Sequence, residues 1–224
     1  CIALAPCLAS LEGADRILCL IGATADGFED QDVVSSLRFA GIDPADGDVD
    51  RLIGSARSAF QEPHDALQEV IDRMIRPGLD VVMVDAACAS SLYAIALGMH
   101  ALESGGADAV VAGGVFCPGP GNSCLFSQFG GNTSTGLRPF DAEADGVVFS
   151  EGAAVVALRR VADAERLGLP MTTALRGAGL SSDGRSPSAN VPQTHGQILA
   201  LERCYENYQI DPTSIDAIEA HGTS

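Results

Sequence analysis

The stretch 81-VVMVDAACASSLYAIALGMHALESGG-106 joins a short run of β-branched residues to a long amphipathic pattern. The first part predicts a buried β-strand over residues 79–87, and the second predicts a helix over 89–104 that ends at a pair of glycines. A stripe of apolar side chains three and four apart is expected to face the sheet: Leu92, Ile95, Ala96, Met99 and Leu102. The next apolar run predicts a strand over 108–115. Strand, helix and strand in this order predict a right-handed βαβ unit in a parallel sheet.

Other apolar runs extend this alternation of strands and helices. Four of them predict further strands, over residues 17–24, 152–160, 172–181 and 215–222. A capping box in which Thr194 pairs with Gln197 predicts a helix that opens there. Residues 31–75 are mostly helical in pattern, whereas 117–146 are rich in Gly, Ser, Asn and Pro and predict a long loop. The chain is therefore predicted to be an α/β protein.

Composition restricts the class of protein. The chain has 224 residues, of which 46% are hydrophobic, enough for a substantial packed core. It contains no apolar run of about 18 residues, the length that a membrane span needs. The net charge of −17, without a single lysine, argues against a binder of nucleic acid or anionic membranes. The chain does not begin with Met and stops directly after a strand pattern, so we expect a piece of a longer protein.

The cysteines indicate the compartment. Seven cysteines form no CxxC pair, which argues against a zinc site. An odd number without paired spacing fits a reducing, cytoplasmic compartment better than a disulfide scaffold. We therefore expect a cytoplasmic protein without structural metal.

Cys88 lies where the predicted strand gives way to the predicted helix. A thiol in that position faces unpaired backbone N–H groups and the positive end of the helix dipole, which favour the nucleophilic thiolate. The same N–H groups can hold the oxyanion formed when sulfur attacks a thioester carbonyl. The neighbours in 86-AACASS-91 are all small, which leaves room for an acyl chain or a pantetheine arm. An inert, buried cysteine fits this position equally well.

His221 is the second candidate. It lies at the end of the predicted strand 215–222, at the carboxyl edge where open α/β sheets gather their active sites. An imidazole beside a thiol can polarise a carbonyl or stabilise an enolate, and a hydrogen-bonded structural histidine is the alternative. The remaining histidines are interpreted as solvated or structural: His64, His100 and His195. A group of acidic residues is interpreted as caps or ion-pair partners rather than catalytic carboxylates: Asp141, Glu143 and Asp145.

Four motifs follow one another in an order that resembles a known family. They are 84-VDAACASSL-92, 139-PFDAEADGVVFSEGAAVVALRR-160, 176-RGAGLSSDGRS-186 and 218-IEAHGTS-224. Together they resemble the ketosynthase domains of β-ketoacyl synthases, especially those of modular polyketide and polyunsaturated fatty acid synthases. The resemblance extends over residues 79–224, whereas residues 1–78 match poorly.

The resemblance implies a thiolase-like fold, an αβαβα layered sandwich of two halves that is usually dimeric. Residues 1–170 would form the N-terminal ketosynthase half, and 171–224 the start of the C-terminal half. Cys88 would accept an acyl group from the phosphopantetheine of an acyl carrier protein, and His221 would be the first of two catalytic histidines. The enolate of a decarboxylated malonyl-type extender would then attack the acyl-cysteine thioester. The resemblance implies no tightly bound cofactor and no metal.

The family's lysine and second histidine have no counterpart in this sequence, so we expect the chain not to condense acyl chains alone. Three alternatives remain: a thiolase-type acyl-CoA acyltransferase, a non-catalytic ketosynthase-like partner subunit, and a truncated pseudo-enzyme. The EAHGTS and PFDAEADG stretches argue against the first alternative, and the presence of Cys88 argues against the second. The Arg159–Arg160 pair is a candidate for docking an acidic carrier protein.

Overall fold

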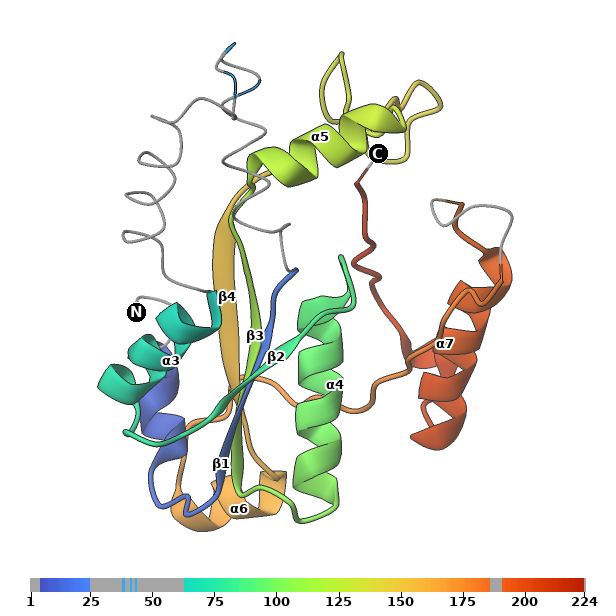
Figure 1. Ribbon diagram of the computed structural model, residues 1–224. Coiled ribbons are helices and arrows are strands. Elements are labelled where there is room, and N and C mark those ends of the chain that lie inside the picture. The colour runs from blue at the N-terminus through green and yellow to red at the C-terminus, as the bar shows by residue number, and fades with distance from the viewer. Residues whose placement is uncertain are drawn as a thin grey trace.

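The centre of the molecule is one four-stranded mixed sheet with the strand order β2-β1-β3-β4 (Figure 1). The computed structural model describes residues 5–24, 38, 41, 43, 63–185 and 191–223. The strands are β1 Ile17–Gly22, β2 Val81–Val84, β3 Ala109–Phe116 and β4 Gly152–Leu158. β1 pairs in parallel with β2 and β3, whereas β4 pairs antiparallel with β3. The predicted strands 17–24, 79–87, 108–115 and 152–160 are thus confirmed as β1 to β4.

Helices cover both faces of this sheet. They are η1 Ala5–Leu11, α3 Pro63–Met74, α4 Ser90–Glu103, α5 Pro120–Gln128, α6 Val161–Leu167, α7 Thr194–Asn207 and η2 Pro212–Ser214. Figure 1 shows α4 standing against one face, α3 and η1 on the other, and α5 across the carboxyl ends of the parallel strands. The helical pattern over 31–75 is confirmed for α3, and most of its other residues lie outside the described part.

Each face of the sheet contributes to a separate hydrophobic core, as the two-residue period of a strand requires. One core joins the sheet to η1 and α3 and includes Leu11, Cys19, Ile21, Ile71 and Val111. The other joins it to α4 and includes Leu20, Ala94, Leu102, Val110 and Ala112. Burial of one large apolar side chain stabilises the fold by about 1.5–3 kcal/mol, so these cores fix the sheet between its helices.

α4 lies close to the sheet because small residues face it. A Cβ atom at Gly98 would lie 2.7 Å from Cγ1 of Val110. The predicted apolar stripe is therefore wrong at Leu92, which is 65% exposed. The spacing identifies an amphipathic helix, but it does not reveal that close packing selects small side chains for the buried face. The buried residues are Ser90, Ala94, Ala96, Gly98, Met99 and Leu102.

Two predicted strands are wrong. Residues 172–181 and 215–222 run as extended segments that pair with no strand among the residues the structure describes. Residues 172–176 and 215–221 are exposed, residues 177–181 are half-buried, and Ile218 is 83% exposed. A β-pattern shows which side chains are apolar, but a strand forms only where a neighbouring strand takes up its backbone hydrogen bonds.

Two predictions near helix starts also need correction. Within the predicted loop 117–146, residues 120–128 form α5, because Pro120 occupies a first-turn position where its missing N–H costs no hydrogen bond. The predicted helix at 194 is confirmed as α7, but its capping box is wrong. The residue at the N-cap is Gln193, and its N–H donates to the carboxylate of Asp183 at 3.1 Å. The preceding segment therefore supplies the cap.

Candidate active site

Cys88 lies in a tight turn between β2 and α4. Ala87, directly before it, has a φ of 50°, in the left-handed region that L-residues seldom adopt. The buried hydroxyl of Ser90 accepts a hydrogen bond from the Ala86 N–H at 2.8 Å and donates one to the Ala87 carbonyl at 2.6 Å. The carboxylate of Asp85 accepts a hydrogen bond from the Ala87 N–H at 3.0 Å. These bonds hold Cys88 exposed at the N-terminal end of α4.

Two glycines let this turn approach the sheet. A Cβ atom at Gly22, the last residue of β1, would lie 2.5 Å from both the Ser90 carbonyl carbon and the Ser91 nitrogen. A Cβ atom at Gly114 of β3 would lie 2.9 Å from Cβ of Ser91. Any side chain there would push α4 away, because packed interiors leave no room for such contacts. The sequence did not predict a role for Gly22 or Gly114 at the site, although both lie near the ends of apolar runs.

A cavity of about 710 Å³ opens at the carboxyl ends of the three parallel strands. Both Cys88 and His221 line it. Figure 1 shows the segment after α7 running past α4 toward α5, which brings His221 to this end of the sheet. The two candidates that were chosen from distant motifs thus meet at one cavity. The alternative of an inert, buried cysteine describes Cys7 and Cys19, which are buried, but not Cys88.

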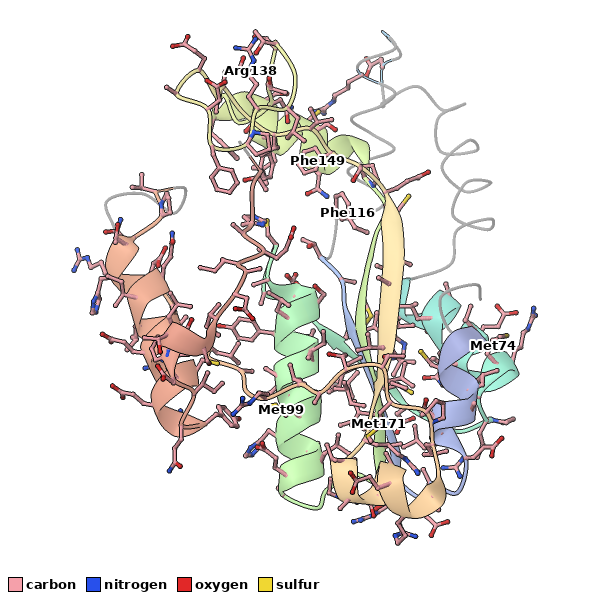
Figure 2. The ribbon with its side chains drawn as sticks, turned by 180° about the vertical axis from the view of Figure 1, so that it is seen from behind. Met74, Met99, Phe116, Arg138, Phe149 and Met171 are labelled. Atoms are coloured by element: carbon pink, nitrogen blue, oxygen red, sulfur yellow. The ribbon has the colours of Figure 1, made fainter. Side chains whose placement is uncertain are left out.

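Aromatic side chains form part of the cavity wall. Phe126 of α5 meets Phe149 edge to face, with ring centroids 4.8 Å apart, and Phe116 at the end of β3 lies 5.8 Å from Phe149. Figure 2 shows Phe116 and Phe149 between α5 and the end of the sheet. The polar residues Asn122 and Glu151 also line the cavity. Its volume lies within the range of about 300–1,000 Å³ typical of small-molecule sites, and the aromatic wall suits an acyl chain.

Two of the three acidic residues interpreted as structural, Asp141 and Asp145, make hydrogen bonds within the loop that follows α5, and none of the three lines the cavity. Asp145 accepts hydrogen bonds from the hydroxyls of Thr133, Ser134 and Thr135 and, at 3.1 Å, from the Ser134 N–H. The Thr133 hydroxyl and these other donors hold the pKa of Asp145 well below its usual range. The carboxylate thereby fixes the loop that follows α5. In the same loop, Asp141 accepts a hydrogen bond from the backbone N–H of residue 143 at 2.8 Å.

Arg160 lies far from the cavity and has internal partners. Its guanidinium forms a salt bridge with Asp163 at 2.6 Å and donates to the backbone carbonyls of Leu102 and Ala107 at 2.9 and 2.8 Å. These contacts tie the C-terminal end of α4 to α6. These contacts within the fold already engage the Arg160 side chain, and docking of a carrier protein by the Arg159–Arg160 pair stays a prediction.

The remaining candidates are structural or exposed. His64 donates from Nε2 to the Val81 carbonyl at 3.1 Å and links α3 to β2, whereas His100 and His195 are exposed. Within residues 5–24, 63–185 and 191–223, no three His, Cys, Asp or Glu side chains gather as a metal site. Over the same residues, no helix has the length and apolar character needed to cross a membrane. None of the six cysteines that the structure describes forms a disulfide.

Comparison with known proteins assigns the family. Residues 80–164 match the family described as "Beta-ketoacyl synthase, N-terminal domain", and residues 172–224 match "Beta-ketoacyl synthase, C-terminal domain". A phenolphthiocerol/phthiocerol polyketide synthase of Mycobacterium tuberculosis is 40% identical over 144 residues, which are 63% of this chain and 8% of that protein.

Solved ketosynthases have the same fold. The ketosynthase from module 6 of the bacillaene synthase of Bacillus subtilis 168 superimposes with a TM-score of 0.72 and 25% identity, over 98% of this chain and 35% of that one. The ishigamide ketosynthase/chain length factor superimposes with a TM-score of 0.72 and 28% identity, over 93% of this chain and 50% of that one. The thiolase-like fold is therefore confirmed, and the chain spans half or less of the length of these relatives. With its ordered motifs and matching fold, the chain belongs to the β-ketoacyl synthase family of the thiolase superfamily, in the group that includes polyketide synthases.

Proposed function

We propose that the chain is the nucleophile-bearing part of a β-ketoacyl synthase-type acyltransferase. The observation that carries this proposal is the presence of Cys88 and His221, from two distant motifs, at one cavity. The Cys88 thiolate attacks the carbonyl carbon of an acyl thioester. A new C–S bond forms to Cys88, the C–S bond to the carrier thiol breaks, and the departing thiolate takes up a proton. N–H groups in the first turn of α4 stabilise the oxyanion of the tetrahedral intermediate.

The second half of the proposed reaction is a decarboxylative Claisen condensation. A malonyl-type extender loses CO₂, and His221, as the first of two family histidines, stabilises the resulting enolate. The enolate carbon attacks the acyl-Cys88 carbonyl, a C–C bond forms, and the Cys88 thiolate leaves. The 3-oxoacyl product stays on the extender's thiol. We propose an acyl carrier protein as the partner, and we propose that the acyl group and the extender are each delivered on the phosphopantetheine of such a carrier. We propose no tightly bound cofactor.

We also propose that the chain forms a homodimer. β4 is an edge strand, and its outer edge pairs with no strand among the described residues. The seven residues of β4 include neither proline nor a charged side chain, the devices that usually protect an exposed edge. A second copy is the proposed occupant, and sedimentation measurements would report its binding as a doubled mass.

The proposed domain division, compartment and activity of the chain are supported by further observations. The match to the N-terminal domain ends at residue 164 and the match to the C-terminal domain begins at residue 172, which supports a boundary between residues 170 and 171. The lack of disulfides among the six described cysteines supports a reducing cytoplasm. Because the sequence has no lysine and no match to the family's second histidine, we propose that this chain alone accepts an acyl group without elongating it.

Acylation by a small thioester tests the function. The chain is incubated with hexanoyl-N-acetylcysteamine, and the adduct is located by peptide mass mapping. We expect one hexanoyl group on Cys88, no adduct in Cys88→Ala, and an unchanged adduct in the control Cys117→Ala, which removes another exposed thiol. An adduct that persists in Cys88→Ala would contradict the assignment of the nucleophile.

The variant His221→Ala separates the two proposed roles. If His221 acts only in condensation, its loss changes the rate of Cys88 acylation by less than a factor of about ten. Loss of a general base slows the step that it assists by about 10²–10⁴-fold, so the two roles give clearly different acylation rates. A larger fall in the acylation rate would instead assign His221 to activation of the thiol.

A further inference from the structure

Tyr93 of α4 makes a hydrogen bond to a distant part of the chain. The residue is half-buried at the end of the first turn of α4, and its hydroxyl donates to the backbone carbonyl of Ser181 at 3.0 Å. Ser181 belongs to the segment 177–183, which precedes α7. Figures 1 and 2 show α7 beside α4, on the side away from the sheet. The bond therefore joins the helix that begins beside Cys88 to the part of the chain around α7.

The segment that accepts this bond is fastened to α7. The Ser181 hydroxyl donates to the Gly196 carbonyl of α7 at 2.5 Å. A Cβ atom at Gly179 would lie 1.9 Å from the Ala200 carbonyl oxygen, so the backbone of the segment lies directly against the helix. Because these contacts hold the two elements together, we refer to the segment and α7 as the α7 unit.

The α7 unit leads to His221. A Cβ atom at Gly177 would lie 2.6 Å from Cδ2 of Tyr208, so the residue that ends α7 also packs on the segment. From there the chain runs through η2 and past α4 to His221 at the cavity (Figure 1). Among the described residues, no other hydrogen bond joins α4 to the α7 unit. The Tyr93 hydroxyl thus fixes the unit that leads to His221 against the helix that begins beside Cys88.

We propose that Tyr93 is a positioning residue, which holds His221 at its working distance from Cys88 through the α7 unit. The inference rests on the proposed function, in which the enolate stabilised by His221 must reach the acyl group on Cys88. Tyr93 does not line the cavity, so it acts through the placement of the two groups and not by contact with the substrate. Placement is decisive for such a step, because a displacement of about 1 Å can slow it about 10²-fold.

A nitroxide on Cys88 measures this placement. Cys117→Ala and Cys124→Ala remove the other thiols that the structure shows exposed, and peptide mapping checks that the label is on Cys88. The label broadens the NMR signals of the four isotope-labelled histidines with the inverse sixth power of their distance. Tyr93→Phe keeps the ring and removes only the hydroxyl. We expect this variant to change the paramagnetic relaxation rate at His221 by roughly twofold, the effect of a displacement of about 1 Å.

Two controls make the measurement specific. His100 lies on α4 itself, so its relaxation rate should be the same with and without Tyr93→Phe. Tyr205→Phe removes a hydroxyl of α7 that has no hydrogen-bond partner within the part of the chain that the structure describes, and we expect all four signals to stay unchanged. Circular dichroism checks that each variant folds, and Tyr93→Leu replaces the phenylalanine variant if that variant does not.

The outcomes distinguish this inference from the proposed function. An unchanged relaxation rate at His221 in Tyr93→Phe overturns the positioning role and leaves the acyltransferase assignment intact. Equal changes at His100 and His221 also overturn it, because α4 itself would then be disturbed. The nitroxide measurement needs no acyl group, so it is independent of acylation. If hexanoyl-N-acetylcysteamine does not acylate Cys88 in the unmodified chain, the proposed function is wrong, and the positioning role that rests on it is wrong with it.

Discussion

The two ends of α4 are built in opposite ways. At the N-terminal end, Ala87 is held in a left-handed conformation and Cys88 is exposed beside the cavity. At the C-terminal end, Asp108 forms a salt bridge with Arg16 at 2.7 Å and lies 3.5 Å from Arg160, and both arginines also donate to backbone carbonyls near the helix end. Strain is found where chemistry is proposed, and ion pairs are found where only stability is needed. Unfavourable conformations at functional sites persist only when the surrounding structure enforces them.

The largest effect in this comparison is expected for Gly22→Ala at the N-terminal end. Its Cβ atom would lie 2.5 Å from backbone atoms of Ser90 and Ser91, so α4 must shift. Overpacking of this kind destabilises proteins by about 1–3 kcal/mol, and we expect Cys88 acylation to fall with it. Urea denaturation and the hexanoyl adduct assay measure the two effects.

The matched control is Gly106→Ala at the C-terminal end. A Cβ atom there would lie no closer than 3.4 Å to any neighbour, the carbonyl oxygen of Ala101, so we expect small changes in both measurements. Equal effects of the two substitutions would show that the close approach at Gly22 is unimportant.

A smaller effect is expected for Ser90→Ala. The substitution leaves the buried Ala86 N–H without the hydroxyl that now accepts its hydrogen bond, a loss of about 1–3 kcal/mol in the free energy of unfolding. The turn that presents Cys88 loosens, and we expect slower acylation. Ser104→Ala is the control at the other end, since its exposed hydroxyl makes one long bond of 3.3 Å to the Ala101 carbonyl. A Ser90→Ala protein with full stability and full acylation would contradict a role for this hydroxyl in holding the turn.

The smallest effect on the site is expected for Asp108→Asn. Hydrogen bonds from Arg16 hold the pKa of Asp108 well below its usual range. Because this carboxyl has a lower pKa in the folded than in the unfolded chain, its stabilisation is present above about pH 4 and is lost as the pH falls below that. Urea midpoints between pH 7 and pH 3 should therefore decline less steeply in the variant, which is already destabilised at pH 7.

The acylation rate at pH 7 provides the other half of this test. Asp108 lies at the end of α4 away from Cys88, so we expect the rate in Asp108→Asn to match that of the unmodified chain. If the urea midpoint of Asp108→Asn declined between pH 7 and pH 3 as steeply as that of the unmodified chain, the ion pairs of Asp108 would contribute nothing to stability. If the variant lost Cys88 acylation, the two ends of α4 would be coupled.

The strands of the sheet and α4 could be predicted because their apolar patterns are long and bounded by glycines. The segments 172–181 and 215–222 have patterns of the same kind but form no strands, since a pattern specifies the faces of a strand and not its partner. α5 was missed for a related reason. Its composition resembles a loop, and only the position of Pro120 in the first turn makes a helix compatible with it.

The candidate site was predictable in its reactive groups and not in its surroundings. Cys88 and His221 followed from ordered motifs, and the fold brings both to the cavity. The positive φ of Ala87 and the hydrogen bond from Tyr93 to Ser181 depend on contacts between elements, which no local pattern encodes. The aromatic residues of the wall come from three segments that are separated in the sequence, so only the tertiary structure groups them.

The most direct test of the central claim, that the fold makes Cys88 the reactive thiol, is competitive alkylation of all cysteines. The chain is treated with a limiting amount of iodoacetamide at pH 7, and each cysteine is quantified by peptide mapping. We predict that Cys88 reacts first, ahead of Cys117 and Cys124, which are also exposed but do not line the cavity at the start of α4. Cys19, whose burial raises its pKa to about 11, should react last. Alkylation of Cys88 no faster than that of Cys117 and Cys124 would contradict the account.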